Sequence, residues 1–314
     1  MAKTKSLKEL PYMRLLPPET TATISRLEVL ASRKMDGTIT GRHTSPKKGF
    51  SVEFSEHRQY VPGDDIRDLD WKVYGKKDRY YIKQYIEETN LRATILLDCS
   101  GSMNYRGDQS AKVDGRIVSK YEYAQYLAAA LGYLAIRQQD AAGLVTFDTE
   151  VREYIPPRSR PSQVRLMLEA IHQRKAGGET GLGEVLHEAA ERIPRRGLVC
   201  IISDMFDEPD RVARALHHFA FRGHEVLLFH IMAEEELTFP FNKFNTFKDL
   251  EVDGVKLQID PKSIKAQYLD KVREFVKSVE RSCGEIQADY IPLTTKERFD
   301  KALALYLSRR RSNR

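Results

Sequence analysis

From about residue 91 to residue 310, the sequence alternates short apolar runs with longer amphipathic segments. Apolar runs of this kind are typical of strands buried on both faces, and strands that alternate with helices predict a parallel sheet covered by helices on both sides. The expected fold class is therefore α/β, with a doubly wound, mostly parallel sheet. We expect strands at residues 93–97, 143–147, 150–155, 198–202, 225–231 and 286–291, and helices at 117–138, 161–173, 181–193, 208–221, 262–282 and 295–309. The two-residue turn Asp148-Thr149 predicts that 143–147 and 150–155 pair antiparallel.

The chain divides into three parts that differ in residue pattern. Residues 1–36 form a basic segment with a short helix expected at 17–35, and residues 37–90 contain short runs of β-forming residues. Residues 91–310 carry the α/β pattern, interrupted at 232–260 by an irregular stretch with short strand-like pieces. We therefore expect a small N-terminal β-rich subdomain before a larger α/β domain.

Composition narrows the classes of protein to which the chain can belong. The formal net charge is +6, and it is concentrated in the first 50 residues and in an arginine-rich tail. Such ends could contact nucleic acid or an anionic membrane surface, but without interleaved aromatic residues we interpret them as solvated termini. The three cysteines form no disulfide framework, and the positive N-terminus lacks the apolar core of a secretory signal. A cytoplasmic location is expected.

One cluster of polar residues follows the first strand directly. Asp98, Ser100 and Ser102 form a D-x-S-x-S pattern at its carboxyl end, where an open α/β sheet binds its ligands. A carboxylate with two hydroxyls is an oxygen-only set that suits a hard cation such as Mg²⁺, with Mn²⁺ and Ca²⁺ as alternatives. Thr180, in a glycine-rich loop, and Asp204, at the end of another buried strand, would complete five ligands if their strands are neighbours.

Other interpretations of this cluster remain open. Ser100 and Ser102 could cap a turn whose backbone amides bind Asp98. Ser100 could instead be a nucleophile, although the G-x-S-x-G elbow is missing and none of the eight histidines can be assigned as its base.

The order and spacing of Asp98, Ser100, Ser102, Thr180 and Asp204 resemble the metal-ion-dependent adhesion site of von Willebrand factor A domains. That resemblance implies that these residues bind Mg²⁺ and that an acidic residue of a partner protein completes the coordination. It also implies a von Willebrand factor A (Rossmann-like) sheet over residues 91–310.

A second motif, in which acidic and basic residues alternate, precedes the sheet. This interleaving favours a tight turn locked by charge-assisted hydrogen bonds, with Trp71, the only tryptophan, as a buried anchor between the subdomain and the sheet. A surface that binds a partner is the alternative. The residues assigned to the clamp or to partner binding are Arg58, Asp64, Asp65, Arg67, Asp70 and Trp71.

The stretch from Glu56 to Lys72, together with the Ile202-Ser203-Asp204 strand end, resembles the bacterial family called domain of unknown function 58. The resemblance spans about residues 37–310, with Leu69 in place of the usual isoleucine. It implies a von Willebrand factor A-like domain that is typically associated with MoxR-type AAA+ ATPases, in the assembly or remodelling of other proteins.

The leading hypothesis is a non-enzymatic, Mg²⁺-dependent protein-binding module whose partner, a MoxR-type ATPase or a client, supplies an acidic residue. The alternative is a hydrolase that uses the same metal to polarise a carbonyl or phosphoryl oxygen. An adaptor for nucleic acid or membranes, built on the basic ends, is a third and weaker hypothesis. Glu234, Glu235 and Glu236 are interpreted as a solvated acidic corner.

Overall fold

The computed structural model of the chain divides into two compact units, one formed by residues 33–90 and the other by residues 1–32 and 91–314. Each unit is described by itself. The structure describes residues 14–17, 21–22, 52–62, 64, 69–87, 91–113, 115–178, 181–194, 196–242, 245–251, 254 and 256–312.

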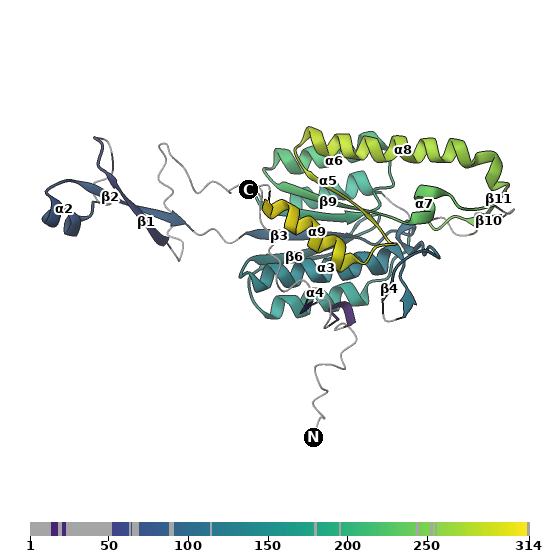
Figure 1. Cartoon of the computed structure of the whole chain (residues 1–314), viewed down its shortest axis with the longest axis horizontal. Coiled ribbons are helices and arrows are strands. Elements are labelled where there is room, and N and C mark those ends of the chain that lie inside the picture. The colour runs from purple at the N-terminus through teal and green to yellow at the C-terminus, as the bar shows by residue number, and fades with distance from the viewer. Residues whose placement is uncertain are drawn as a thin grey trace, which may run out of the picture. The chain divides into compact units, whose positions relative to one another are not determined.

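The larger unit is built on a six-stranded sheet with the order β12-β9-β8-β3-β6-β7 (Figure 1). All neighbours are parallel except β6 and β7, which form the expected antiparallel pair. Because β3 lies between β8 and β6, the winding direction of the chain reverses between β3 and β8, and ligands of open α/β sheets bind at such a reversal. The strands are β3 (Arg92–Asp98), β6 (Ala141–Phe147), β7 (Val151–Arg158), β8 (Leu198–Ser203), β9 (Glu225–Met232) and β12 (Asp289–Thr294).

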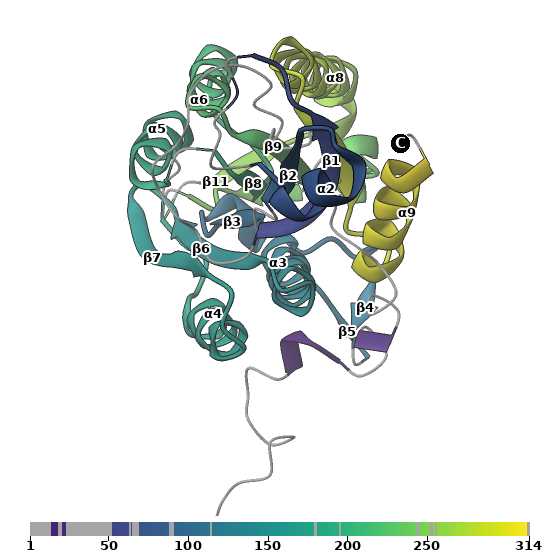
Figure 2. The ribbon, with the colours of Figure 1, turned by 90° about the vertical axis from the view of Figure 1, so that its left-hand side faces the viewer.

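Helices cover both faces of this sheet, as the sequence predicts (Figure 2). One face carries α3 (Lys120–Arg137), α4 (Ser162–Gln173) and α9 (Phe299–Ser312). The other carries α5 (Leu182–Arg192), α6 (Pro209–Phe221) and α8 (Pro261–Glu285).

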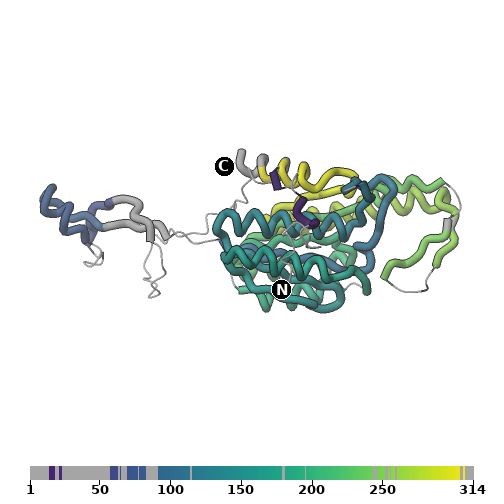
Figure 3. The backbone as a smooth tube through the Cα atoms, turned by 90° about the horizontal axis from the view of Figure 1, so that it is seen from below, coloured from purple at the N-terminus to yellow at the C-terminus, as the bar shows by residue number. Residues whose placement is uncertain are grey.

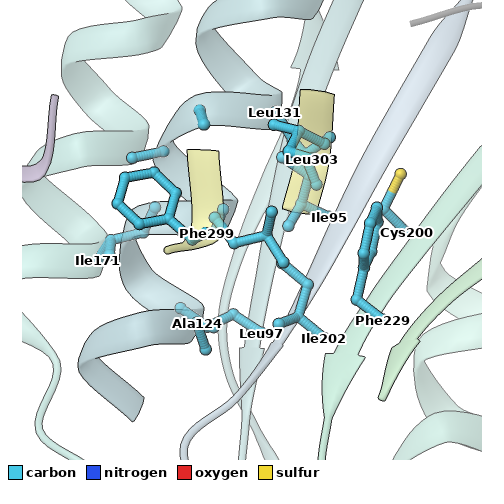
Figure 4. Packing of buried hydrophobic residues seen from close by; sticks show 14 of the residues in the cluster. Ile95, Leu97, Ala124, Leu131, Ile171, Cys200, Ile202, Phe229, Phe299 and Leu303 are labelled. Atoms are coloured by element: carbon cyan, nitrogen blue, oxygen red, sulfur yellow. The ribbon is translucent and has the colours of Figure 1, made fainter. Parts of the chain in front are cut away.

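The two faces of β3 explain why its sequence is continuously apolar. Ile95 and Leu97 pack against Phe299 and other helix residues on one face (Figure 4), whereas Leu96 belongs to the core on the opposite face. Successive side chains of a strand point to opposite faces, so a strand covered on both sides must be apolar at each position. All six residues of β8 are buried for the same reason.

Short elements fill the connections of the larger unit. The turn of 3₁₀ helix η4 (Ser102–Asn104) and the pair β4 (Lys112–Val113) and β5 (Arg116–Ile117) lie between β3 and α3. After β9, the chain forms α7 (Glu234–Thr238) and the pair β10 (Asn245–Lys248) and β11 (Lys256–Ile259), which can be followed in Figure 3. The short strands expected within the irregular stretch at 232–260 are therefore present, whereas the helix α7 was not expected.

The smaller unit contains the antiparallel pair β1 (Val52–Gln59) and β2 (Tyr81–Glu87), as expected of a β-rich subdomain. The helix α2 (Trp71–Lys77) between them was not expected. Its seven residues include Val73, Tyr74 and Gly75, which are poor helix formers. The helix is instead started by Asp70, whose carboxylate accepts hydrogen bonds from the amides of Lys72 and Val73.

Several boundaries differ from the sequence prediction, most clearly near the C-terminal end of the larger unit. Helix α8 continues through Gly284 to Glu285, and the chain leaves it where Gln287 adopts a left-handed conformation, so β12 begins three residues later than expected. The last helix is displaced in the same direction and begins at Phe299. Of the helix expected at 17–35, only Pro17, Thr21 and Ala22 lie within the described residues.

The N-terminal segment contributes to the larger unit rather than standing apart from it. Leu15 and Leu16 are buried in the core that α3 and α4 cover. All three cysteines are buried free thiols. Among the described residues, no helix is both long enough and apolar enough to span a membrane.

Candidate functional site

Asp98 is the last residue of β3, and its side chain is completely buried. Its Oδ1 accepts a hydrogen bond from the amide of Ser100 at 2.8 Å, and its Oδ2 accepts one from the hydroxyl of Ser203 at 2.6 Å. The hydroxyls of Ser100 and Ser102 lie 3.0 Å apart. The D-x-S-x-S residues therefore gather their oxygens at the carboxyl end of one strand. The amide bond to Asp98 also fits the turn-capping interpretation, so this contact alone does not separate the two.

Asp204 follows the last residue of β8, and β8 is the parallel neighbour of β3. Both aspartates thus lie at the carboxyl edge of the sheet, on the two strands between which the winding direction reverses. Asp204 is completely buried, and the Ser203 hydroxyl that binds Asp98 belongs to the residue directly before it. The structure brings together four of the five expected ligands, on adjacent strand ends.

The fifth expected ligand, Thr180, lies outside the described residues. The preceding glycines do contact the D-x-S-x-S loop, because Gly177 donates an amide hydrogen bond to Cys99 O at 2.9 Å and Gly101 donates one to Gly178 O at 3.0 Å. The role of Thr180 as a ligand remains a prediction.

Asp98 is a buried acid that forms no ion pair with a basic side chain of the described residues. Among the described residues no lysine or arginine forms an ion pair with it; its hydrogen bonds come from an amide and a hydroxyl. Burial, and after it the negative charge of Asp204, raise the pKa of Asp98 to about 7. A cation between the two carboxylates would remove both causes.

The sequence analysis missed Lys120, whose ammonium is completely buried beside Asp204. Its Nζ lies 2.8 Å from Asp204 Oδ2 and 2.6 Å from Glu236 Oε1. Burial by itself would lower the pKa of Lys120, but the charges of Asp204 and Glu236 outweigh it and the pKa is raised. Lys120 therefore stays charged and occupies one oxygen of a candidate metal ligand.

The periodicity of α3 contains a signal that identifies this lysine. Tyr123, Ala124 and Leu127 are three, four and seven residues after Lys120, and all of them are buried. Residues with this spacing share one face of a helix, so Lys120 had to lie on the buried face and needed an internal acid. One of its two acids, Glu236, belongs to the predicted solvated corner. That prediction is wrong for Glu235 and Glu236, because Glu235 is buried and Glu236 binds Lys120.

The donor set fits a divalent cation. Within the described ranges, no three His, Cys, Asp or Glu side chains are placed to hold a metal, so the serine hydroxyls would be required as ligands. Asp98, Asp204 and Glu236 with the one ammonium of Lys120 leave two negative charges when all three acids are ionised. One divalent cation would neutralise this buried group, and Mg²⁺ accepts carboxylate and other oxygen ligands.

A second segment lies against the D-x-S-x-S loop. The backbone carbonyl of Leu250, between β10 and β11, comes so close to Gly101 that a Cβ on this glycine would be 2.2 Å from its oxygen. The same Cβ would lie 2.8 Å from the carbonyl oxygen of Gly178. Gly101 is therefore required by space, since two backbone segments converge on it.

In the smaller unit, some of the motif residues form the expected clamp. Arg58 Nη2 lies 2.8 Å from Asp64 Oδ1, and the other oxygen of Asp64 accepts the amide of Val61, so the turn after β1 is fixed at both carboxylate oxygens. This bond, with the backbone bond from Val61, lowers the pKa of Asp64. Asp70 caps α2 and its Oδ2 lies 2.8 Å from His57 Nε2.

The expectation that Trp71 is a buried anchor is wrong for the unit that carries it. The side chain is 60% exposed on the first turn of α2, where its ring meets Tyr74 edge to face. Asp65 and Arg67 lie outside the described residues.

Comparisons with known proteins identify a family and relatives that are similar to the chain in sequence. The profile of the family described as "Protein of unknown function DUF58" matches residues 56–277. Uncharacterized proteins Mb1516 of Mycobacterium bovis and Rv1480 of Mycobacterium tuberculosis are each 27% identical over 248 residues, which cover 78% of this chain and 75% of theirs.

Two solved structures are similar to the chain at low identity. The conserved hypothetical protein BatB from Bacteroides thetaiotaomicron is 18% identical with a TM-score of 0.42, covering 71% of this chain and 99% of its own. The SpRpn10 VWA domain is 12% identical with a TM-score of 0.36, covering 68% and 94%. The strand order of the larger unit is that of a doubly wound α/β sheet with one antiparallel edge strand.

Proposed function

The chain belongs to the DUF58 family of proteins of unknown function, and on this premise we propose that it is a protein-binding module that depends on a divalent cation. Asp98, Ser100, Ser102 and Asp204, with Thr180, would hold Mg²⁺. When bound, the ion would accept a carboxylate oxygen of a partner protein as a further ligand. The partner that we propose is a MoxR-type AAA+ ATPase.

One observation carries this proposal: Asp98 and Asp204 are both fully buried at the ends of adjacent strands, and only Asp204 has a basic partner among the described residues. Two neighbouring buried carboxylates, of which only one has an ammonium partner, are costly unless a further cation lies between them. The hydroxyls of Ser100 and Ser102 give the hard-oxygen environment that Mg²⁺ prefers.

Binding is favoured over hydrolysis because the ionisable groups around Asp204 are unsuited to general base catalysis. Lys120 remains protonated between its two acids. His230 is buried with both ring nitrogens in hydrogen-bond contact, one with Asp204 O at 2.9 Å and one with the Tyr290 hydroxyl at 2.8 Å. Burial lowers its pKa to about 4, which makes it a poor base at neutral pH.

The test is capture of a purified MoxR-type ATPase from the same organism on the immobilised full chain. Chelation also strips Mg²⁺ from nucleotide, so the deciding comparison is between variants at constant Mg²⁺. Asp98→Asn keeps the shape of the side chain and should abolish capture. Asp140→Asn is the matched control, since Asp140 lies before β6 at the opposite end of the sheet and accepts only the Leu91 amide. Equal capture by both variants would contradict the proposal.

A further inference from the structure

A cavity of about 530 Å³ lies beside the D-x-S-x-S loop, and nothing in the proposed metal site uses it. This volume is within the roughly 300–1,000 Å³ of ligand-binding clefts. Its walls come from segments far apart in the sequence: Arg14 and Leu15, the chain around Asn104, the start of α3, and residues 172–176 after the body of α4. The amide of Asn104 donates to Ala176 O at 2.9 Å and joins two of these walls.

Two backbone segments that line the cavity continue into the D-x-S-x-S loop or bind it. Asn104 ends the 3₁₀ turn that begins at Ser102. On the other wall, Ala176 is followed by Gly177, whose amide binds Cys99 O inside the D-x-S-x-S sequence. The cavity therefore adjoins the chain segment that carries the candidate ligands Ser100 and Ser102.

The walls of the cavity are rich in positive charge. Glu122 is the one acid among the residues that line it, and it is paired with Arg106 at 2.9 Å, while Arg174 is paired with Asp148. Among the described residues, Arg14 and Lys175 form no ion pair, and both are exposed. The basic residues of the lining are Arg14, Arg106, His172, Arg174 and Lys175.

The excess positive charge of the cavity is best compared with the charge of the metal site. A divalent cation would neutralise the two excess negative charges around Asp98, Asp204 and Lys120, and would leave little net charge to attract an acidic partner from a distance. The exposed ammonium of Lys175 and the exposed guanidinium of Arg14, both in the cavity lining, keep their positive charges. Charged groups at the rim of an interface steer encounter and select partners of opposite sign.

We propose that the cavity binds a second acidic side chain of the segment whose first carboxylate reaches the metal. This inference rests on the proposed function, and it specifies the partner: the bound segment carries at least two acids close together in sequence. A protein segment is favoured over a nucleic acid because the cavity walls adjoin the segment that carries the proposed carboxylate site, and they also offer the amides of Asn104 and Gln125 and the apolar side chain of Leu15.

The probe is a fluorescein-labelled hexaglutamate, compared with a peptide that has a single glutamate among glutamines. Binding to the full chain is measured by fluorescence polarisation in Mg²⁺ and in EDTA. Lys175→Glu and Arg14→Glu should each weaken hexaglutamate binding about tenfold in Mg²⁺ and in EDTA, and should change binding of the single-glutamate peptide much less. Lys277→Glu, the same charge change at an exposed position of α8, on the opposite face of the sheet, is the matched control.

The outcomes separate this inference from the function on which it rests. If Lys175→Glu and Lys277→Glu have the same effect, the cavity proposal is overturned, whatever the Mg²⁺ dependence. If hexaglutamate binding is insensitive both to EDTA and to Asp98→Asn while Lys175→Glu still weakens it, the metal-dependent function fails and the acidic specificity of the cavity stands. A hexathymidylate that displaces hexaglutamate at equal concentration would overturn the assignment to a protein segment.

Discussion

The ammonium of Lys120 lies 2.8 Å from Oδ2 of Asp204, and both side chains are completely buried. Glu236 from α7 binds the same ammonium, so one lysine links the start of α3, the end of β8 and α7. Ion pairs thus connect the candidate metal site to α3 and α7, two helices that contribute no ligand.

Replacement of this lysine should be costly. Lys120→Met keeps most of the volume but leaves two buried carboxylates without their cation, which typically costs about 3–5 kcal/mol of unfolding free energy. Urea unfolding followed by circular dichroism measures the loss. Lys277→Met, at an exposed position, is the control and should lie close to wild type. A Lys120→Met protein as stable as this control would contradict the internal ion pair.

The same substitution has an expected effect on the metal. The ammonium competes with a cation for Asp204, so Lys120→Met should bind Mg²⁺ more tightly than wild type. A titration of both proteins under conditions where both are folded gives the ratio of the two affinities. Weaker binding by the variant would mean that Lys120 supports the site rather than competing with the metal.

Gly101 should tolerate no side chain. A Cβ there would meet the backbone oxygens of Leu250 and Gly178, so Gly101→Ala must displace one of the two segments and should cost about 1–3 kcal/mol. Gly177→Ala is a matched control in the same loop region, since a Cβ at Gly177 meets nothing within 4 Å. Thermal unfolding of both variants gives the comparison, and equal melting temperatures would contradict the close approach at Gly101.

Trp71 should contribute little to stability. Because the indole is 60% exposed, Trp71→Ala should change the free energy of unfolding by no more than about 1 kcal/mol, and not by the loss expected of a buried aromatic residue. Trp71 is the only tryptophan, so the fluorescence of the native chain reports on it directly. Emission close to that of free tryptophan is expected, and strongly blue-shifted emission would show that the ring is covered.

The stability of the larger unit should fall as the solution is acidified through the titration range of His224. Burial, with a contribution from the charge of Arg222, lowers the pKa of His224 from 6.5 to about 4. A histidine with a depressed pKa binds its proton more readily in the unfolded chain, so its contribution to stability is complete above pH 6.5 and is lost between pH 6.5 and 4.

The difference should amount to about 3 kcal/mol at pH 4, from roughly 1.4 kcal/mol for each unit of pKa shift. His224→Leu removes this titration, and its unfolding free energy should depend less on pH over the same range. Urea unfolding of both proteins at pH 7 and at pH 4 makes the comparison. Parallel losses in the two proteins would assign the acid sensitivity to other groups.

Most of the sheet was predictable because its strands are covered on both faces. Continuous apolar runs such as the one that ends at Asp98 are hard to interpret as anything but buried strands, whereas the adjacency of β3 and β8 came only from the structure. The residues at which helices and strands begin and end were less predictable. Helix α8 passes through Gly284, a residue that usually ends helices, and this shifted the last strand by three residues.

The candidate site was predictable only where its residues follow strands. Asp98 and Asp204 were found because parallel strands end at one edge, whereas Lys120 reaches the same place from the start of a helix and Glu236 from a short helix after β9. Helix α2 was missed because one capping contact by Asp70 outweighs the poor helix propensity of the following residues. Contacts between distant segments have no local sequence signature.

Mg²⁺ titration calorimetry of the full chain tests the central claim most directly, with Asp98→Asn and the control Asp140→Asn measured alongside wild type. We expect wild type and Asp140→Asn to bind one Mg²⁺ with the same affinity and Asp98→Asn to show no binding heat while its circular dichroism spectrum is unchanged. Undiminished Mg²⁺ binding by a folded Asp98→Asn protein, or no binding by wild type, would contradict a metal site at the ends of β3 and β8.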